Sequence, residues 1–386
     1  MWNAPSEAAI TDLVPVSTVA EMFSVLEDDE DITWLPEIPG DPFQFVEYRV
    51  TRFLMSWFLL FVTIMGLVGN ILCIVVLSMR ARTNSTTVYL LALAISDLCV
   101  VINGAVVHLS YGFGKPNILS SHPAVCKICF YAAFMSTQLS GWLLVAVTFE
   151  RLVVVFFPLK AKVVCTVRSA YITVISVTLF ISGYNMHYFW SYDVVSVNII
   201  NTNRMISTCS LTTSNPGVLQ FMLTVRPWAD IVIKTLIPFS CLLTWNTSII
   251  AKLSYESHKR KSMTEQNSEQ SNISSMTFML LIVNFVYLIC LAPAQILFLI
   301  YKYSSYRVPA TTQSKALEGM LWALSLTATR INHSVNFILY FMCGNQFRNE
   351  FYQVLGKYCP CKWKQQQSDP ESGPANTNTP TSKLES

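Results

Sequence analysis

The sequence predicts an all-α membrane protein: a seven-transmembrane helix bundle with a short amphipathic eighth helix and a β-hairpin in an outer loop. Hydrophobic residues make up 52% of the 386 residues, and charged residues only 13%, against roughly 25% in soluble domains. Seven long apolar segments follow one another along the chain. The formal net charge of +3 is too small to indicate a nucleic-acid partner.

Each of the seven segments is long enough to cross a bilayer, which takes about 20 mostly apolar residues. The apolar runs are continuous rather than alternating, so they are predicted to be helices and not the strands of a transmembrane barrel. The third segment is the least obvious, because the polar residues Ser136, Thr137, Gln138 and Ser140 interrupt it. The expected spans are residues 54–77, 88–109, 126–155, 170–190, 228–253, 276–301 and 316–342.

Charge predicts how the chain lies in the membrane. An odd number of crossings places the two termini on opposite sides. Lys and Arg, as in the cluster Lys259-Arg260-Lys261, are concentrated in the segments that face the cytoplasm if the N-terminus is outside. Since such a bias sets the orientation of membrane proteins, we expect a multi-pass plasma-membrane protein with an extracellular N-terminus and a cytoplasmic C-terminus.

The composition divides the chain into three regions. Residues 1–50 carry 11 Asp and Glu against one Arg and are expected to be an acidic, disordered extracellular tail. Residues 51–356 form the membrane domain, including an amphipathic stretch at residues 345–355. Residues 357–386 are rich in Gln, Ser, Pro and Thr and are expected to be a disordered cytoplasmic tail. The inner loop at residues 254–275 is expected to be disordered as well.

The loop between the fourth and fifth spans has the pattern of two strands. Residues 194–200 and 205–211 are separated by the turn-forming sequence Asn201-Thr202-Asn203. Two such runs joined by a short polar turn predict a β-hairpin.

Five polar residues fall within four of the hydrophobic segments, at depths that a helix rise of 1.5 Å per residue makes comparable. An ionised Asp at mid-bilayer costs about 2.5–3.5 kcal/mol, so it should face a partner or water. The five side chains either share one polar cavity or make separate interhelical hydrogen bonds worth about 0.6 kcal/mol each. They are Asn70, Asp97, Ser140, Asn332 and Asn336.

The fifth and seventh spans also carry charges. Asp230 and Lys234 are four residues apart, hence on one helical face, and form either a self-neutralising ion pair or the charged wall of a pocket. Pro238 should loosen this helix and leave the Lys234 carbonyl without its usual donor. Arg330 has no acid nearby in the sequence, so its expected partner is Asp230, Asp97 or a bound anionic group.

These positions resemble those of the rhodopsin-like (class A) G-protein-coupled receptors over about residues 50–356. Cys126 lies 25 residues before Arg151, the family's spacing from its disulfide cysteine to its cytoplasmic arginine. Residues 226–230 and the second inner loop further resemble invertebrate neuropeptide receptors of the FMRFamide type. The matching motifs are Gly69-Asn70, residues 90–98, Glu150-Arg151-Leu152, Pro158-Leu159, Pro238, Pro293, residues 332–340 and Phe347-Arg348.

The resemblance implies a receptor that binds an extracellular ligand, expected to be a neuropeptide, in an outer pocket closed above by the hairpin. It also implies a disulfide between Cys126 and Cys209, with Cys129 as the weaker alternative to Cys126. The acidic tail is then either plain solvated chain or an electrostatic guide for a cationic peptide. The polar candidates for the pocket are Gln138, Asp230, Lys234, Gln295 and Arg330.

The same resemblance assigns roles to deeper residues. An allosteric sodium ion would bind in the polar cavity at Asp97. The sixth helix would move outward on activation and open a site for a heterotrimeric G protein. Arrestin and kinases would act on the tail, and the basic third inner loop would contact the G protein and anionic lipid. The residues expected to form the switch are Glu150, Arg151, Pro293 and Tyr340.

Four positions depart from the family pattern. Leu152 and Asn246 stand where the family has tyrosines, Leu291 replaces a tryptophan of the sixth helix, and Phe337 replaces a proline of the seventh. The replacements indicate a divergent receptor, and the missing tryptophan puts the affinity for sodium in question.

Other functions fit less well. Within the same fold, the alternative is an orphan or chemosensory receptor for a small molecule. An ion-coupled transporter would need repeats and a continuous polar path, and the sequence shows neither. The five histidines are dispersed, and nucleophile and phosphate-binding motifs are missing, so an enzyme is not expected. Cys359 and Cys361 follow the amphipathic stretch and are candidates for palmitoylation.

Overall fold

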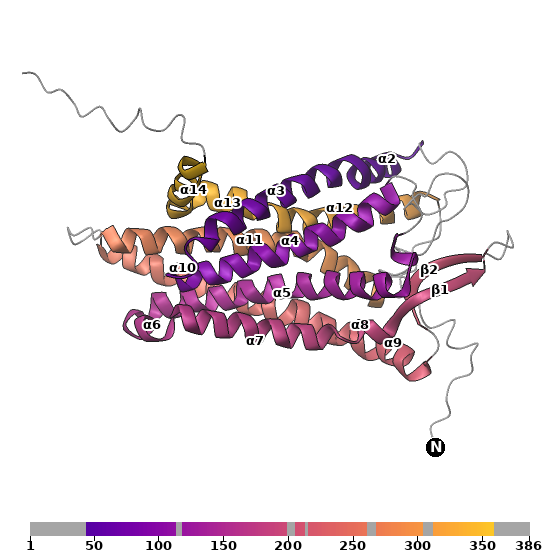
Figure 1. Ribbon diagram of the computed structural model, residues 1–386, viewed down its shortest axis with the longest axis horizontal. Helices are drawn as coiled ribbons and strands as arrows, with labels where there is room; N and C mark the ends of the chain where they lie inside the picture. Colours follow the sequence, from indigo (N-terminus) through magenta and orange to yellow (C-terminus); the bar gives the residue numbers. More distant parts are fainter. Residues whose placement is uncertain are drawn as a thin grey trace, which may run out of the picture.

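The structure is a computed structural model that describes residues 44–112, 118–198, 205–212, 215–260, 268–303 and 312–358. Within these residues, long helices lie side by side in one elongated bundle (Figure 1). One end of the bundle carries a β-hairpin, and we call it the hairpin end. The other end carries α14 (Asn345–Tyr358), and we call it the α14 end.

All seven expected spans are helical, which confirms the predicted bundle. Six of the described crossings are long and apolar enough to span a membrane, whereas the seventh is less apolar. In chain order the crossings are α2 (Val46–Phe53) with η2 (Leu54–Phe58) and α3 (Leu59–Ser78), α4 (Ser85–Gly112), α5 (Pro123–Phe156), α7 (Val167–Asn185), α9 (Pro216–Asp230) with η4 (Ile231–Leu236) and α10 (Ile237–Arg260), α11 (Ser268–Tyr303), and α12 (Thr312–Ser334) with α13 (Asn336–Cys343).

Several helix starts follow from the local sequence. The side chains of His122, Thr166 and Asn215 accept a backbone N–H from the first turn of α5, α7 and α9. Proline occupies the first turn of α5 and of α9, where a missing N–H costs nothing. The short α6 (Pro158–Val164) connects α5 to α7, and the short α8 (Tyr188–Ser191) leads from α7 into the hairpin.

The first crossing shows why the bundle needs lipid around it. Phe61, Ile64, Val68, Ile71 and Val75 are exposed, and their spacing of three and four residues puts them on one stripe of the helix. An apolar stripe of this length on the outside of a bundle is stable only against hydrocarbon.

The hairpin pairs β1 (Tyr192–Asn198) with β2 (Met205–Leu211) in antiparallel register, with Val194 opposite Cys209. The second strand is confirmed, and the first begins two residues earlier than expected. The expected turn at residues 201–203 lies outside the described residues. A disulfide joins Cys209 to Cys126 on α5, with the two Cα atoms 5.6 Å apart, which confirms this pairing. Cys129 is a free thiol.

A salt bridge adds a second tie between the hairpin and α5. The Lys127 Nζ lies 3.0 Å from Oδ2 of Asp193 on β1. The hydrogen bond from Lys127 lowers the pKa of the Asp193 carboxyl.

Helices reach further than the apolar segments predicted. α10 continues to Arg260 and α11 begins at Ser268, so much of the loop expected to be disordered at residues 254–275 is helical. Polar helix extends beyond the membrane because its side chains are hydrated there, and Lys252 and Glu256 support it with an i,i+4 ion pair at 3.4 Å. α2 begins at Val46, which moves the boundary expected at residue 50. Residues 1–43 and 359–386, with Cys359 and Cys361, lie outside the described residues.

Besides the π-helical η2 of the first crossing, two crossings are irregular, and the sequence predicted loosening only for the fifth, through Pro238. The fifth contains the π-helical segment η4, shortly before Pro238. The seventh is interrupted at Val335, although Phe337 replaces the proline that the family carries there. Both irregularities lie beside polar residues of the candidate sites.

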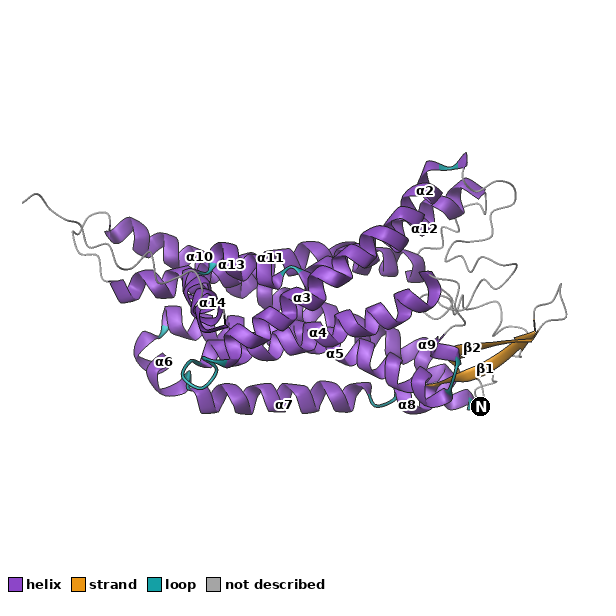
Figure 2. Cartoon of the chain, turned by 45° about the horizontal axis from the view of Figure 1, so that its top comes forward, coloured by secondary structure: helices purple, strands orange, loops and turns teal. Residues whose placement is uncertain are grey.

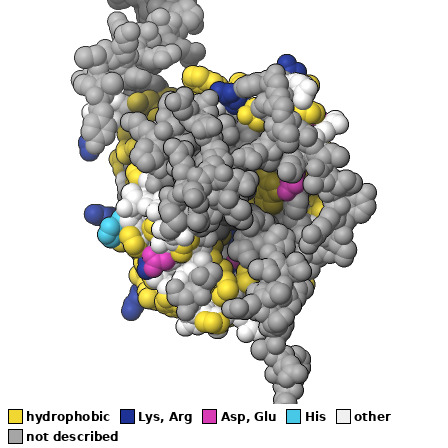
Figure 3. Space-filling model, turned by 90° about the vertical axis from the view of Figure 1, so that its right-hand side faces the viewer, with side chains coloured by type: hydrophobic (Ala, Val, Ile, Leu, Met, Phe, Trp, Pro, Cys, Tyr) yellow, Lys and Arg dark blue, Asp and Glu magenta, His cyan; other side chains and the backbone are white. Residues whose placement is uncertain are grey.

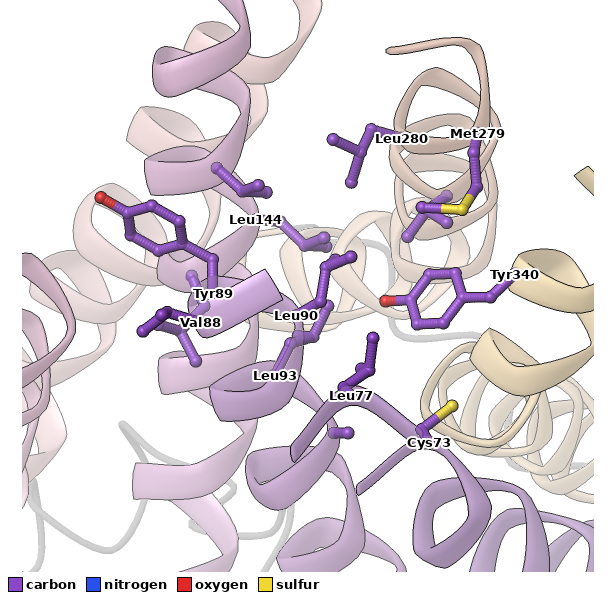
Figure 4. Close-up of a cluster of buried hydrophobic side chains, with 14 of the residues drawn as sticks. Cys73, Leu77, Val88, Tyr89, Leu90, Leu93, Leu144, Met279, Leu280 and Tyr340 are labelled. Atoms are coloured by element: carbon purple, nitrogen blue, oxygen red, sulfur yellow. The ribbon is translucent and has the colours of Figure 1, made fainter. Parts of the chain in front are cut away.

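The largest buried cluster of apolar side chains lies toward the α14 end. Figure 4 shows Tyr340 reaching from α13 into this cluster, beside Leu77, Leu90 and Met279. α14 lies across the end of the bundle rather than along it (Figures 1 and 2). This packing fixes α13 and α14 against the first and sixth crossings.

Candidate functional site

A cavity of about 280 Å³ opens among α4, α5, η4, α11 and α12, near the hairpin end. Its walls are mostly apolar and aromatic, which is typical of ligand pockets, and its volume is close to their lower limit of about 300 Å³. Figure 3 views the molecule from this end, and hydrophobic side chains are the most widespread of those drawn in colour. Four of the five predicted pocket residues have a place on the cavity wall, namely Asp230, Lys234, Gln295 and Arg330.

The fifth pocket candidate, Gln138, lies behind the wall in a polar network around Asp230. The Asp230 Oδ2 accepts from the Arg226 Nε at 2.8 Å, and its Oδ1 accepts from Gln138 at 3.2 Å and from the Tyr184 hydroxyl at 3.1 Å. Asn185 donates to Gln138 at 2.7 Å. Asp230 is therefore neutralised by Arg226, and its carboxylate is already occupied by three donors.

Of the two arrangements expected for Asp230 and Lys234, the described residues show the charged pocket wall and not the ion pair. Asp230 is paired with Arg226, and Lys234 follows it on the π-helical η4. The Lys234 Nζ instead lies 5.6 Å from the ring centroid of Phe134. The Trp142 indole donates to the Ile233 carbonyl at 3.1 Å, so η4 gains a donor one residue before the carbonyl that was expected to lack one.

Arg330 pairs with neither of the acids expected for it. Its Nη1 donates to the Val100 backbone carbonyl at 2.8 Å, and its guanidinium lies against Gly104 of α4. A Cβ at Gly104 would lie 2.2 Å from Nη1, so the glycine makes room for this cation. The guanidinium reaches across from α12 to α4 while still lining the cavity. Gln295 accepts from the Thr235 hydroxyl at 2.9 Å.

Deeper in the bundle, a second polar network converges on Asp97, which is fully buried at 0% exposure. The Ser140 hydroxyl donates to Oδ1 at 2.7 Å, and Asn336 Nδ2 donates to Oδ2 at 2.6 Å. The His333 Nδ1 lies 2.7 Å from Oδ1. Asn70 donates to the His333 carbonyl at 2.8 Å. Four of the five predicted polar residues thus share one network.

Asn332 is the exception, since its side chain is buried but makes no hydrogen bond to the described residues. Of the two alternatives, a shared cavity or separate hydrogen bonds, the described residues show neither for Asn332. His333, the next residue, lies beside Asp97 instead.

The residues around Asp97 do not fit a sodium ion as they are arranged. Hard cations take oxygen ligands, and a carboxylate is the strongest of them. Both Asp97 oxygens already accept hydrogen bonds, and the ring of His333 occupies the approach to Oδ1. A sodium ion would have to displace His333 from Asp97.

A third cluster lies where α5 approaches the α14 end. The Arg151 Nη2 lies 3.5 Å from the Glu150 Oε2 and also hydrogen-bonds the Thr86 hydroxyl of α4. Glu150 accepts from Thr86 at 3.2 Å and from Ser85. Both charged side chains are buried, so α4 holds the pair in place.

The remaining switch candidates lie on the sixth and seventh crossings. Pro293 lies within α11 without interrupting it. The buried Tyr340 hydroxyl has no hydrogen-bond partner among the described residues. Next to it in depth, Asn284 of α11 donates to Thr148 at 2.9 Å and to Asn246 at 3.0 Å. The residue that replaces a family tyrosine, Asn246, thus links the fifth and sixth crossings.

Sequence reasoning missed several members of these networks. Arg226 lies four residues before Asp230, a spacing that favours an ion pair on a helix, so the sequence does carry a signal for it. His333 is part of the seventh-crossing motif, but nothing in its local sequence distinguishes it from the other four histidines. Asn284 and Thr86 carry no local signal, because their partners lie on other helices.

Comparison with known proteins identifies the fold. Residues 69–340 match the family "7 transmembrane receptor (rhodopsin family)". The FMRFamide receptor of Drosophila melanogaster is 24% identical over 77% of this chain and 52% of its own length. Neuromedin-U receptor 2 of Mus musculus is 25% identical over 81% of this chain and 77% of its own. The FMRFamide peptide receptor frpr-18 of Caenorhabditis elegans is 27% identical over 79% and 70%.

The chain thus spans about half the length of the Drosophila relative. The predicted resemblance to receptors of the FMRFamide type is confirmed, and a receptor of this family is not an enzyme. With seven helical crossings, a hairpin held by the Cys126–Cys209 disulfide and a family match over most of its length, this chain belongs to the rhodopsin family of seven-transmembrane receptors.

Proposed function

We propose that this receptor binds an extracellular peptide in the cavity near the hairpin end and, in response, activates a heterotrimeric G protein at the α14 end. The cavity itself carries the proposal, because an apolar pocket of about 280 Å³ among five elements of the bundle suits the end of a peptide. The names of the relatives, FMRFamide and neuromedin-U receptors, favour a peptide over a small molecule.

The proposed orientation has the hairpin end outside the cell and the α14 end in the cytosol, at the plasma membrane. A disulfide such as Cys126–Cys209 persists in the oxidising extracellular medium, and the basic residues Lys259 and Arg260 end α10 at the other end. Epitope tags on intact and permeabilised cells test the orientation. Tags that place both termini on one side would overturn it.

Activation would shift a two-state equilibrium by the difference in ligand affinity between the states. In the described state Glu150 and Thr86 hold Arg151. Outward movement of α11 about Pro293 would break the bonds of Asn284 to α5 and α10 and open a site where Arg151 meets the G protein. The Tyr340 hydroxyl, which lacks a partner among the described residues, would then gain one in the opened form.

A peptide-library calcium screen in transfected cells tests the proposed function. We expect at least one peptide to give a response that untransfected cells lack. Silence to every peptide together with a response to an amine or odorant would replace the ligand class. Arg151→Ala should keep agonist binding and lose G-protein activation, whereas unchanged signalling would remove Arg151 from the mechanism.

A further inference from the structure

The charges that line the cavity are unequally paired. Asp230 is the acidic residue on the described wall, and Arg226, Gln138 and Tyr184 already occupy its two oxygens. A cationic ligand group would have to displace Arg226, a buried arginine with 4% exposure, from an ion pair of 2.8 Å. Breaking a buried pair by removing one partner is strongly destabilising. The acid is therefore poorly placed to bind a cation.

Lys234 is a cation on the same wall with no acid of its own. Its ammonium makes no hydrogen bond or ion pair to the described residues, and its nearest recorded contact is the Phe134 ring at 5.6 Å. Asp230, the acid four residues earlier, is already paired with Arg226. The rest of the cavity wall is mostly apolar, and in such surroundings the attraction between opposite charges is stronger than in water.

Arg330 is a second such cation, contributed from α12. Among the described residues its recorded hydrogen bond is the one from Nη1 to the Val100 carbonyl. A guanidinium has five N–H donors in a fork that matches a carboxylate, so most of its capacity is unused. Gly104 leaves the space in which the guanidinium lies.

The uncharged donors of the wall are largely occupied within the protein. The hydroxyls of Thr137, Ser325 and Thr329 each donate to a backbone carbonyl one turn earlier in their own helices. The donors that remain for a ligand on the described wall thus include the two cations and the amide N–H of Gln295, whose oxygen accepts from Thr235, and of these only the cations carry charge. Unpaired cations in a membrane protein are costly, and they mark binding sites when they face a cavity.

From these contacts we infer that the cavity binds a carboxylate of the ligand, shared by Lys234 and Arg330. The inference rests on the proposed function and adds the chemistry of the ligand: agonists are peptides whose pocket-bound end is acidic. The carboxylate belongs either to an Asp or Glu side chain or to a free C-terminus. Apolar side chains next to it would fill the aromatic wall.

Matched synthetic peptides test this inference on the full-length receptor in calcium assays. Each agonist found in the library is resynthesised with Asp or Glu replaced by Asn or Gln, and separately with its C-terminus amidated or left free. Loss of one charge-assisted hydrogen bond should lower potency about tenfold to a hundredfold. The arm that loses potency shows whether the carboxylate comes from a side chain or from the C-terminus.

Receptor variants then assign the effect to the two cations. In Lys234→Gln and in Arg330→Gln, the acidic peptide should lose potency and its neutral partner should not. The ratio of the two potencies within each pair should therefore fall toward one. Lys234→Arg should retain it. Arg49→Gln is the matched control, because Arg49 is an exposed cation of α2 that does not line the cavity. Surface expression of every variant is measured with an N-terminal tag.

The possible outcomes separate the two proposals. If peptides activate the receptor but acidic and neutral partners are equally potent on the wild type, the carboxylate site is refuted and the peptide receptor stands. If no peptide of either kind activates it while an amine or odorant does, the proposed function itself fails. An equal loss for both members of a pair in the variants would show that the cations only support the fold.

Discussion

Charged side chains at the centre of the bundle have partners within the protein, whereas two cations that line the cavity have no acidic partner among the described residues. At the centre, the buried Asp97 has a donor on each oxygen, and the buried Arg151 is held by Glu150 and Thr86. At the cavity, Lys234 and Arg330 have no acid among the described residues. We call a buried charge saturated when partners in the protein satisfy it, and unsaturated when they do not. Saturated charges stabilise one arrangement of the helices. Unsaturated charges destabilise the empty receptor, and a ligand that pairs with them regains that free energy on binding.

The largest expected effect is the loss of a saturated charge. Asp97→Ala should lower the free energy of unfolding by about 3–5 kcal/mol, because it leaves Ser140, His333 and Asn336 buried without an acceptor. Thermal unfolding of the purified receptor in detergent measures the change. Asp97→Asn, which keeps the shape and one acceptor oxygen, should cost less. If the two substitutions cost the same, the network is not held by the carboxylate.

An unsaturated charge should behave in the opposite way. Arg330→Gln should raise the free energy of unfolding by on the order of 1 kcal/mol, less than the about 2.5–3.5 kcal/mol assigned to an Arg at mid-bilayer, because Arg330 is half-buried and hydrogen-bonded to Val100. Arg226→Gln is the matched control and should lower it, since Asp230 would lose its counter-ion. The same thermal measurement serves both. A stability loss in Arg330→Gln would mean that Arg330, like Asp97, stabilises the fold through its own contacts.

The sequence predicted the first of these two regions better than the second. Hydrophobic length predicted every crossing, because a bilayer imposes one length on all of them. Polar residues in apolar segments left open whether Asp97, Ser140, Asn336 and Asn70 would share one network or bond separately, and the structure shows the shared network. Spacing could not decide between an Asp230–Lys234 ion pair and a charged pocket wall either, because the donors that occupy Asp230 include residues of other helices, and such tertiary contacts leave no local signal.

The same reason explains the other misses. Val335 interrupts the seventh crossing without a proline, next to the bond between Asn336 and Asp97, so a tertiary contact and not local sequence marks the position. His333, and not its neighbour Asn332, lies beside Asp97, because consecutive side chains of an α-helix point about 100° apart around the helix axis. Spacing in the sequence cannot resolve a rotation of that size.

The place of His333 gives a smaller expected effect. Wild-type thermal stability should be the same in sodium chloride and in N-methylglucamine chloride of equal ionic strength, because Asp97 is already occupied. His333→Ser should clear the approach to Oδ1, which would keep only the hydrogen bond from Ser140, and let sodium stabilise the receptor by on the order of 0.5 kcal/mol when its concentration is near the dissociation constant. Potassium chloride is the control for ionic strength. A sodium effect of that size in the wild type would mean that the residues around Asp97 do bind sodium with His333 in place.

The smallest expected effect concerns the hairpin at the same end of the bundle as the cavity. Lys127 lowers the pKa of Asp193, so the folded state holds this carboxyl ionised at pH values where the unfolded chain, with a pKa of about 3.9, begins to protonate. The stabilisation is complete above the unfolded pKa and is lost as the pH falls through the lower folded pKa. Because the Asp193 side chain is 40% exposed, we expect only a few tenths of a kcal/mol, reduced further by salt.

Thermal unfolding measured from pH 7 to pH 3 tests this expectation. Below pH about 4, the wild type should lose stability slightly more steeply than Asp193→Asn. Parallel curves would mean that the disulfide Cys126–Cys209 alone holds the hairpin, and that the outer region, unlike the centre, gains no stability from its charges.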